Sequence, residues 1–231
     1  GENVLTDISF KAKKGQTIAV IGSTGSGKST LINLIPRYYD VTKGSVKVDG
    51  VDVRDMTQKE LRDKLGYVPQ KGVLFSGTID SNIRYGKPEI TDAQVKEAAE
   101  VAQATEFIDT KPEKYESPVS QGGTNVSGGQ KQRLSIARAI AKDPEIFIFD
   151  DSFSALDFKT DSQLRKALKE YTKDATTVIV SQRISTILGA DQIIVLDDGH
   201  MAGIGTHKEL MANCEVYQQI ARSQLSEEEL A

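Results

Sequence analysis

The sequence of 231 residues predicts an α/β fold with a mostly parallel sheet. Short apolar runs rich in β-branched residues alternate with segments of helical periodicity, which is the pattern of strand–helix–strand units. Capping-box spacings, in which a threonine is followed three residues later by Glu or Gln, mark three helix starts: Thr57 with Glu60, Thr91 with Gln94, and Thr206 with Glu209.

The elements follow in order along the chain. We expect strands at 17–21, 46–49, 66–69, 145–149, 176–180 and 192–196. We expect helices at 28–35, 57–65, 91–108, 128–142, 160–171, 206–213 and 215–224. The segment from about 71 to 142 breaks the alternation, because it has helical patterns and no convincing strand. We therefore expect one domain over 1–231, with an α/β core (1–70 and 143–231) and an inserted helical subdomain (about 71–142).

Composition restricts the class of protein. A net charge of −4 without a basic stripe argues against a nucleic-acid partner. The single cysteine, Cys214, excludes an internal disulfide and favours a reducing compartment. No apolar run approaches the roughly 18 residues that span a bilayer, and we expect no signal peptide. Because the sequence starts at Gly1 within a pattern, we expect it to be part of a longer chain.

The first motif that carries chemistry is GSTGSGKS at 22–29, between a predicted strand and a predicted helix. Its glycines let successive backbone N–H groups point at phosphate oxygens, Lys28 would reach the β- and γ-phosphates, and the Ser29 hydroxyl would ligate Mg²⁺. The alternative is a flexible Gly/Ser loop. The predicted nucleotide-binding residues are Gly22, Ser23, Thr24, Gly25, Ser26, Gly27, Lys28, Ser29 and Thr30.

A second motif, IFIFDD at 146–151, ends a buried strand in two carboxylates. Burying two adjacent carboxylates is costly unless a cation or phosphate lies opposite. In a phosphate loop of this kind Mg²⁺ is held by the loop's Ser/Thr and by an Asp at the end of another strand, which assigns Asp150. The alternative role for Asp150 is to cap the following turn.

The third motif, VSGGQ at 126–130, opens a predicted amphipathic helix. Ser127, Gly128 and Gly129 at a helix start form a second phosphate-binding arrangement. Since one triphosphate does not need two such arrangements from one chain, we expect this one to serve a nucleotide held by another molecule, in a dimer. A plain serine N-cap is the alternative.

Together these residues resemble the nucleotide-binding domain of ATP-binding cassette (ABC) transporters. The phosphate loop is similar to their Walker A motif, and Asp150 is similar to the Walker B aspartate. The VSGGQ segment is similar to the LSGGQ signature, with Val126 as a departure, and it contains Ser127, Gly129 and Gln130. Gln70 matches the glutamine loop, which senses Mg²⁺ and contacts the transmembrane domain, and SALD at 154–157 matches the D-loop. The resemblance runs from about Val4 to Leu225 and is closest to exporters. It implies an antiparallel β part near the N-terminus.

Two residues depart from the family pattern. Asp151 stands where the family has the glutamate that polarises the attacking water, and Gln182 stands where it has the switch histidine. Aspartate is one methylene shorter, and a misplacement of about 1 Å can cost roughly a hundredfold in rate. Glutamine carries no proton or positive charge. We therefore expect a degenerate site, as in one half of a heterodimeric multidrug-type exporter, with Asp151, Gln182 and Gln70 as the catalytic residues and Ser29, Gln70 and Asp150 around Mg²⁺.

The resemblance implies a domain that binds ATP and Mg²⁺, dimerises head-to-tail with a second nucleotide-binding domain on another chain, and drives export through a transmembrane partner. We expect weak ATPase activity in isolation and a location at the cytoplasmic face of the cell membrane. The aromatic residue on which the family stacks adenine would precede Gly1. The alternatives are a regulatory module without turnover, and a soluble or importer ABC ATPase.

Two further sets of side chains are assigned from the sequence. Leu74, Phe75, Ile79 and Ile83 would receive the transmembrane partner, or else form the core of the helical subdomain. We expect His200, in a predicted hairpin, and His207, at a helix start, to be surface residues without a catalytic role.

Overall fold

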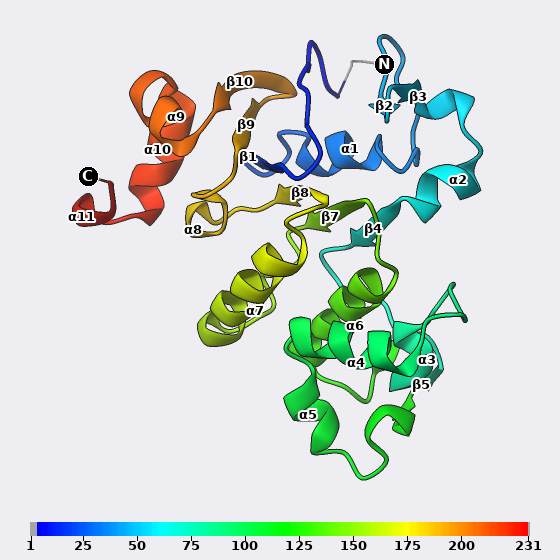
Figure 1. Ribbon diagram of the computed structural model, residues 1–231. Coiled ribbons are helices and arrows are strands. Elements are labelled where there is room, and N and C mark those ends of the chain that lie inside the picture. Colours follow the sequence, from blue (N-terminus) through cyan, green and yellow to red (C-terminus); the bar gives the residue numbers. More distant parts are fainter. Residues whose placement is uncertain (1–3, 231) are drawn as a thin grey trace. The chain divides into compact units, whose positions relative to one another are not determined.

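The computed structural model describes residues 4–230, which form two compact units. The first unit contains the chain up to Leu65 together with the residues from Thr176 onward, and the second contains Gly66–Ala175. Figure 1 shows the helices and strands of both units. The predicted α/β class is confirmed, with parallel and antiparallel strands and covering helices. No helix among the described residues is long and apolar enough to cross a bilayer.

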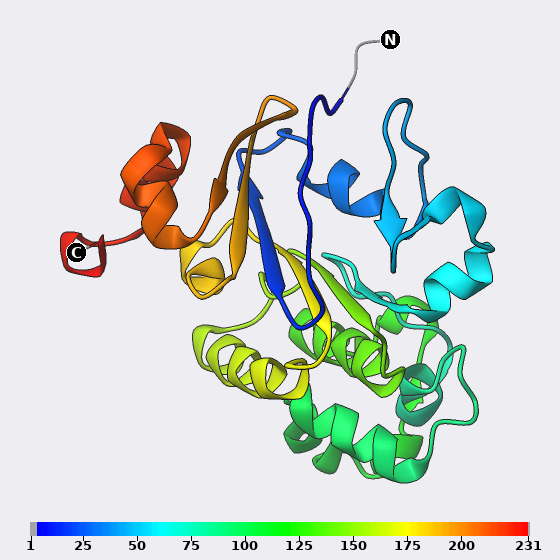
Figure 2. The ribbon, with the colours of Figure 1, turned by 45° about the horizontal axis from the view of Figure 1, so that its top comes forward.

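The first unit is organised around β1 (Thr17–Gly22), which pairs in parallel with β8 (Thr176–Val180) on one side and β9 (Gln192–Asp197) on the other. Figure 2 shows β1 and β9 side by side. The chain then turns back as β10 (His200–Gly205), antiparallel to β9. Because β1 has a neighbour on both sides and is covered on both faces, its residues from Ile18 onward are buried, as expected for the apolar sequence TIAVIG.

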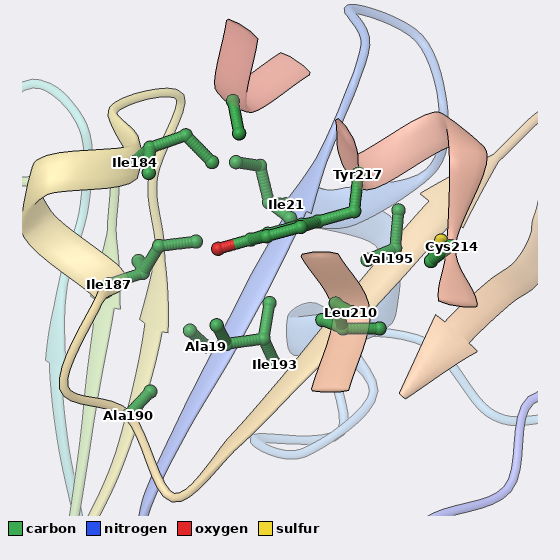
Figure 3. Close-up of a cluster of buried hydrophobic side chains, with 11 residues drawn as sticks. Ala19, Ile21, Ile184, Ile187, Ala190, Ile193, Val195, Leu210, Cys214 and Tyr217 are labelled. Carbon is green, nitrogen blue, oxygen red and sulfur yellow. The ribbon is translucent and has the colours of Figure 1, made fainter. Parts of the chain in front are cut away.

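One face of this sheet packs against helices from the end of the chain. The core cluster takes Ile21 from β1, Ile193 and Val195 from β9, and Tyr217 from α10 (Glu215–Gln224). Figure 3 shows the Tyr217 ring lying across this cluster. The Tyr217 side chain is fully buried, and burial raises the pKa of its hydroxyl to about 12. This packing fixes α10 against the strands that carry the phosphate loop.

The remaining elements of the first unit are short. The expected strand at 46–49 is reduced to β2 (Lys47–Val48), which pairs with β3 (Val51–Asp52) as an antiparallel hairpin. The other helices are α1 (Lys28–Asn33), the 3₁₀ turn η1 (Val53–Asp55), α2 (Gln58–Asp63), α8 (Ile184–Ile187), α9 (His207–Asn213) and α11 (Glu227–Leu230). The capping boxes predicted at Thr57 and Thr206 are both formed.

In the second unit β4 (Leu65–Val68) lies beside β7 (Ile146–Asp150), and most of the remainder is helical. The longer helices are α4 (Asp92–Val101), α6 (Gly128–Ala141) and α7 (Phe158–Tyr171), and α4 packs along α6 (Figure 1). The shorter elements are β5 (Gly77–Thr78), α3 (Ile79–Ile83), α5 (Thr105–Asp109), η2 (Lys114–Glu116), β6 (Pro118–Val119) and η3 (Gln121–Gly123).

Two expectations for the second unit were wrong. The helix expected at 91–108 ends at Val101 and restarts at Thr105, because Gln103 adopts a left-handed backbone with φ of 58°. The segment expected to lack strands contains the two-residue pair β5–β6.

The surface assigned to Leu74, Ile79 and Ile83 was also wrong. All three side chains are fully buried, so the alternative, the core of the helical region, is correct for them. Helix α3, which carries Ile79 and Ile83, packs against α6, whose buried residues include Leu134 and Ile136. Only Phe75 of the original four is partly accessible.

Candidate functional site

The loop at 22–27 joins β1 to α1, and its glycines are needed at specific positions. Gly25 and Gly27 have φ of 80° and 102°, a conformation that is strained for any residue with a side chain. A Cβ at Gly22 would lie 2.3 Å from the Leu196 carbonyl oxygen, and one at Gly27 would lie 2.5 Å from Leu5 Cδ2. The loop is therefore packed too closely for side chains at 22 and 27. Such close packing is not expected of the alternative, a flexible Gly/Ser loop.

The polar groups of this loop suit a polyphosphate. Helix α1 begins at Lys28 with Gly27 as its N-cap, and in the described part of the chain no side-chain hydrogen bond caps this start. The Lys28 ammonium is buried and donates to the carbonyl oxygens of Gly22 and Ser23, at 2.8 and 2.7 Å. Ser26 is 2% exposed, and among the described residues its hydroxyl has no partner. A buried ammonium and a buried hydroxyl beside an uncapped helix start fit a phosphate ligand.

The segment after β8 lies at the same edge of the sheet as the phosphate loop. In the parallel pair of β1 and β8, Val20 aligns with Val180. Gly22 and Gln182 therefore lie two residues beyond this aligned pair, each on its own chain segment. The Ser181 amide donates to the Val20 carbonyl at 3.3 Å, and the Ser181 hydroxyl accepts from the Arg183 amide at 3.0 Å. The Gln182 side chain is exposed. The sheet therefore presents Gln182 beside the loop that the sequence assigns to phosphate.

In the second unit, β7 ends at Asp150 and the next residue turns sharply. Asp151 has φ of 48°, a left-handed conformation that aspartate tolerates better than longer side chains. The Gln70 amide nitrogen donates to the Asp151 carboxylate at 3.1 Å, and the Tyr67 hydroxyl lies 3.5 Å from the Asp150 carboxylate. Within this unit Gln70 therefore lies beside the end of the strand that carries the two carboxylates, although these residues come from separate motifs.

Sequence reasoning missed two residues that hold this arrangement. Gln132, 1% exposed on α6, accepts from the Gly72 amide at 2.7 Å and donates to the Pro69 carbonyl at 2.9 Å. Ser152 is fully buried and donates to the Val68 carbonyl at 2.7 Å. Gln132 thus ties the segment around Gln70 to the helix that starts at the VSGGQ motif. The second glutamine of SGGQKQ was visible in the sequence, but its partners lie some 60 residues away.

The VSGGQ segment forms the start of α6 with Ser127 as N-cap. The Ser127 hydroxyl accepts from the Gln130 amide at 3.2 Å, and the Gln130 side chain accepts from the Ser127 amide at 3.3 Å, so the alternative reading, a serine cap, is also correct. Ser127 and Gly128 are exposed. A Cβ at Gly129 would meet the Ala155 carbonyl at 3.6 Å, which places the SALD segment against this helix start. Two motifs far apart in the sequence thus share one exposed face of the second unit.

Both histidines lie where the sequence placed them. His200 is exposed at the start of β10, and its Nδ1 lies 2.8 Å from the Asp198 carbonyl oxygen. His207 begins α9, with its Nδ1 2.7 Å from the Tyr217 hydroxyl. Neither residue contacts the phosphate loop in the hydrogen bonds described here.

Comparison with known proteins gives consistent matches. The family model described as ABC transporter matches residues 5–154. An uncharacterized ABC transporter ATP-binding protein from Mycobacterium tuberculosis is 50% identical over 224 residues, covering 96% of this chain. A multidrug export ATP-binding/permease protein from Staphylococcus aureus is 46% identical over 217 residues, covering 94%. This chain spans 38% of the length of each relative. A solved bacterial Atm1-family ABC exporter with ATP bound superimposes with a TM-score of 0.93 at 38% identity, over 97% of this chain and 40% of that one.

Removal of the Gln132 amide tests how the glutamine loop is held. Gln132→Ala leaves the Pro69 carbonyl and the Gly72 amide without their buried partner, at a cost of about 1–3 kcal/mol. We expect tryptic cleavage after Lys71 to become about tenfold faster, because the segment opens more often. Cleavage after Lys43, in an exposed loop of the other unit, serves as the control within the same digest and should not change. Equal cleavage after Lys71 in both proteins would contradict the role given to Gln132.

Proposed function

This chain belongs to the ABC transporter family, and we propose that it is the nucleotide-binding domain of an exporter, spanning residues 1–231, which binds MgATP and hydrolyses it to drive transport. The observation that carries the proposal is the loop from Gly22 to Lys28, with its close backbone packing, its buried ammonium and a buried Ser26 hydroxyl that has no partner within residues 4–230. The relative that is named a multidrug export ATP-binding/permease protein supports the exporter type.

In this proposal the motifs identified in the sequence supply the groups that bind MgATP. Lys28 and the loop amides would hold the phosphates. Ser29 and Asp150 would offer the oxygen ligands that Mg²⁺ prefers. Gln70 contacts Asp151, the residue after Asp150, and would complete the Mg²⁺ site. Bound Mg²⁺ would neutralise charge on the phosphate oxygens. Lys28 would exchange its two carbonyl partners for phosphate oxygens, which are stronger acceptors for an ammonium.

Asp151 and Gln182 would make this site a slow one. Asp151 would orient the attacking water, but its short side chain ends on the Gln70 amide at 3.1 Å and its left-handed backbone restricts where it can reach. Gln182 can donate a hydrogen bond to the γ-phosphate, but it brings no positive charge. Loss of reach and loss of charge act on the same transition state, and together they support a degenerate site that mainly holds ATP.

The VSGGQ face would complete a second site in a partner domain. Ser127 and Gly128 are exposed, and the SALD segment lies against the same helix start. We propose that a second nucleotide-binding domain, on a different chain, docks head-to-tail here and binds its own ATP between its phosphate loop and Ser127, Gly129 and Gln130. The intact VSGGQ motif beside a weakened catalytic centre supports a heterodimer.

The contact with a transmembrane partner would use Val73, Phe75 and Tyr85, because Leu74, Ile79 and Ile83 are buried. Val73 and Tyr85 are 51% and 56% exposed, and the partly accessible Phe75 stacks on Tyr85 with ring centroids 4.2 Å apart. Arg138 packs against both rings, and burial lowers its pKa to about 10. An exposed apolar patch backed by Arg138 would suit helices projecting from a membrane domain. Such a contact would place this chain at the cytoplasmic face of the membrane.

The phosphate loop is tested by removing its ammonium. Lys28→Ala should abolish MgATP binding by this chain in isothermal titration calorimetry, because the charge that faces the β- and γ-phosphates is lost. Lys14→Ala removes an exposed lysine from the same unit and should bind as wild type does. Undiminished MgATP binding by Lys28→Ala would refute the assignment of the loop.

The VSGGQ face is tested in the assembled heterodimer. Ser127→Arg puts bulk and charge where the partner's γ-phosphate would lie, so ATPase activity of the dimer should vanish while MgATP binding by the isolated chain is unchanged. Ser127→Asp retains a good N-cap for α6 and opposes a phosphate with negative charge, so it should have the same effect without loss of the helix. Thr42→Arg, on an exposed loop, is the charge control. Full ATPase activity of the dimer with both Ser127 variants would refute the proposal that the VSGGQ motif acts on the partner's nucleotide.

The degenerate site is tested by restoring both residues. Asp151→Glu with Gln182→His should raise hydrolysis at this site at least about tenfold, equivalent to about 1.4 kcal/mol of barrier, and each single change should recover less. The partner needs an intact signature and its own catalytic glutamate changed to Gln, so that only this site turns over. No gain with MgATP bound would favour a nucleotide-binding module without turnover.

A further inference from the structure

The position of Gln182 depends on a residue near the end of the described chain. The Gln224 side chain, at the last residue of α10, donates from Nε2 to the Gln182 carbonyl at 2.7 Å. Its Oε1 accepts from the Ile184 amide at 2.8 Å. One amide group thus spans the backbone on either side of Arg183, across a sequence separation of about 40 residues.

This contact is the second of two anchors on the Gln182 segment. The first is Ser181, whose amide donates to Val20 of β1 and whose hydroxyl accepts from the Arg183 amide. The Ser181 anchor fixes the segment to the strand that carries the phosphate loop. Gln224 fixes the following turn to α10, on the outer side of the sheet. With both anchors in place the backbone of Gln182 has little freedom, although its side chain is exposed.

Helix α10 can transmit its position because it is itself held firmly. Tyr217 and Ala221 are both fully buried in the core cluster, and they pack there with Ile184 and Ile187 of α8, the short helix that follows Gln182. The Tyr217 hydroxyl also contacts His207 of α9. Any movement of α10 would therefore move the turn that carries Gln182.

We propose that Gln224 is a positioning residue, which sets where Gln182 meets the γ-phosphate and so couples α10 to hydrolysis at this chain's own site. The proposal rests on the proposed function. Because Gln224 acts through backbone groups, it should act equally on Gln182 and on a histidine at the same position. A positioning role lowers kcat and leaves KM nearly unchanged, because binding of ATP depends on the phosphate loop.

The test uses Gln224→Met, which keeps the side-chain length and helix preference but removes both hydrogen bonds. Gln219→Met, an exposed residue of the same helix whose amide contacts only Glu215 in the described hydrogen bonds, is the matched control. In this chain without nucleotide, amide hydrogen exchange at Ile184 should become about fivefold faster in Gln224→Met and stay unchanged in Gln219→Met. Unchanged exchange at Ile184 would show that Gln224 does not hold the Gln182 segment, whether or not the chain binds ATP.

Turnover then separates positioning from a purely structural contact. In the assembled dimer with Asp151→Glu, Gln182→His and a silenced partner site, Gln224→Met should lower kcat about three- to tenfold and keep KM within about twofold. Faster exchange with kcat unchanged would overturn the proposal, as would equal loss of kcat in the Gln219→Met control. A chain that binds no MgATP would overturn the proposed function, and the exchange measurement would still decide whether Gln224 holds the segment.

Discussion

The parallel pairing of β1 with β8 and β9 is the constraint on which the rest of the first unit depends. It buries β1 from Ile18 onward and brings the ends of β1 and β8 to one edge of the sheet. The loop that leaves β1 must then turn within a few residues beside the Leu196 carbonyl, which leaves no room for a side chain at Gly22. The same pairing delivers Gln182 to that edge. Strand register therefore places the loop at 22–27 and Gln182 at one edge of the sheet before any side chain is considered.

The second unit has its own organising contact, which is α6 with its N-terminal cap. The helix begins after the exposed N-cap residue Ser127. Its Gln132 side chain contacts the glutamine loop, which is about 60 residues away in sequence but adjacent in space. Its Arg138 side chain packs against the rings of Phe75 and Tyr85. One helix thus connects the face proposed for a partner nucleotide, the Gln70–Asp151 contact and the patch proposed for a transmembrane partner. Such a connection is a physical route by which docking on one face could bias the others.

Motifs formed by neighbouring residues could be predicted from the sequence, and contacts between distant residues could not. The phosphate loop, Asp150 and the Ser127 cap are local patterns with a chemical reason for each residue type. Gln132 and Gln224 look like ordinary polar helix residues, because their partners are main-chain groups some 40 to 60 residues away. Leu74, Ile79 and Ile83 were misplaced because a short apolar run does not reveal which face is covered. Asp151 combines both cases, since its shortness is visible in the sequence and its left-handed backbone is not.

We propose that this chain holds ATP while its partner hydrolyses it, and the chemical state of the nucleotide at each site decides whether this is so. A photoreactive ATP labelled on the adenine ring can be crosslinked during steady turnover of the heterodimer, after which the two chains are separated and their bound nucleotides identified. We expect mainly triphosphate on this chain and mainly diphosphate on the partner. Diphosphate on this chain, appearing as fast as on the partner, would contradict it.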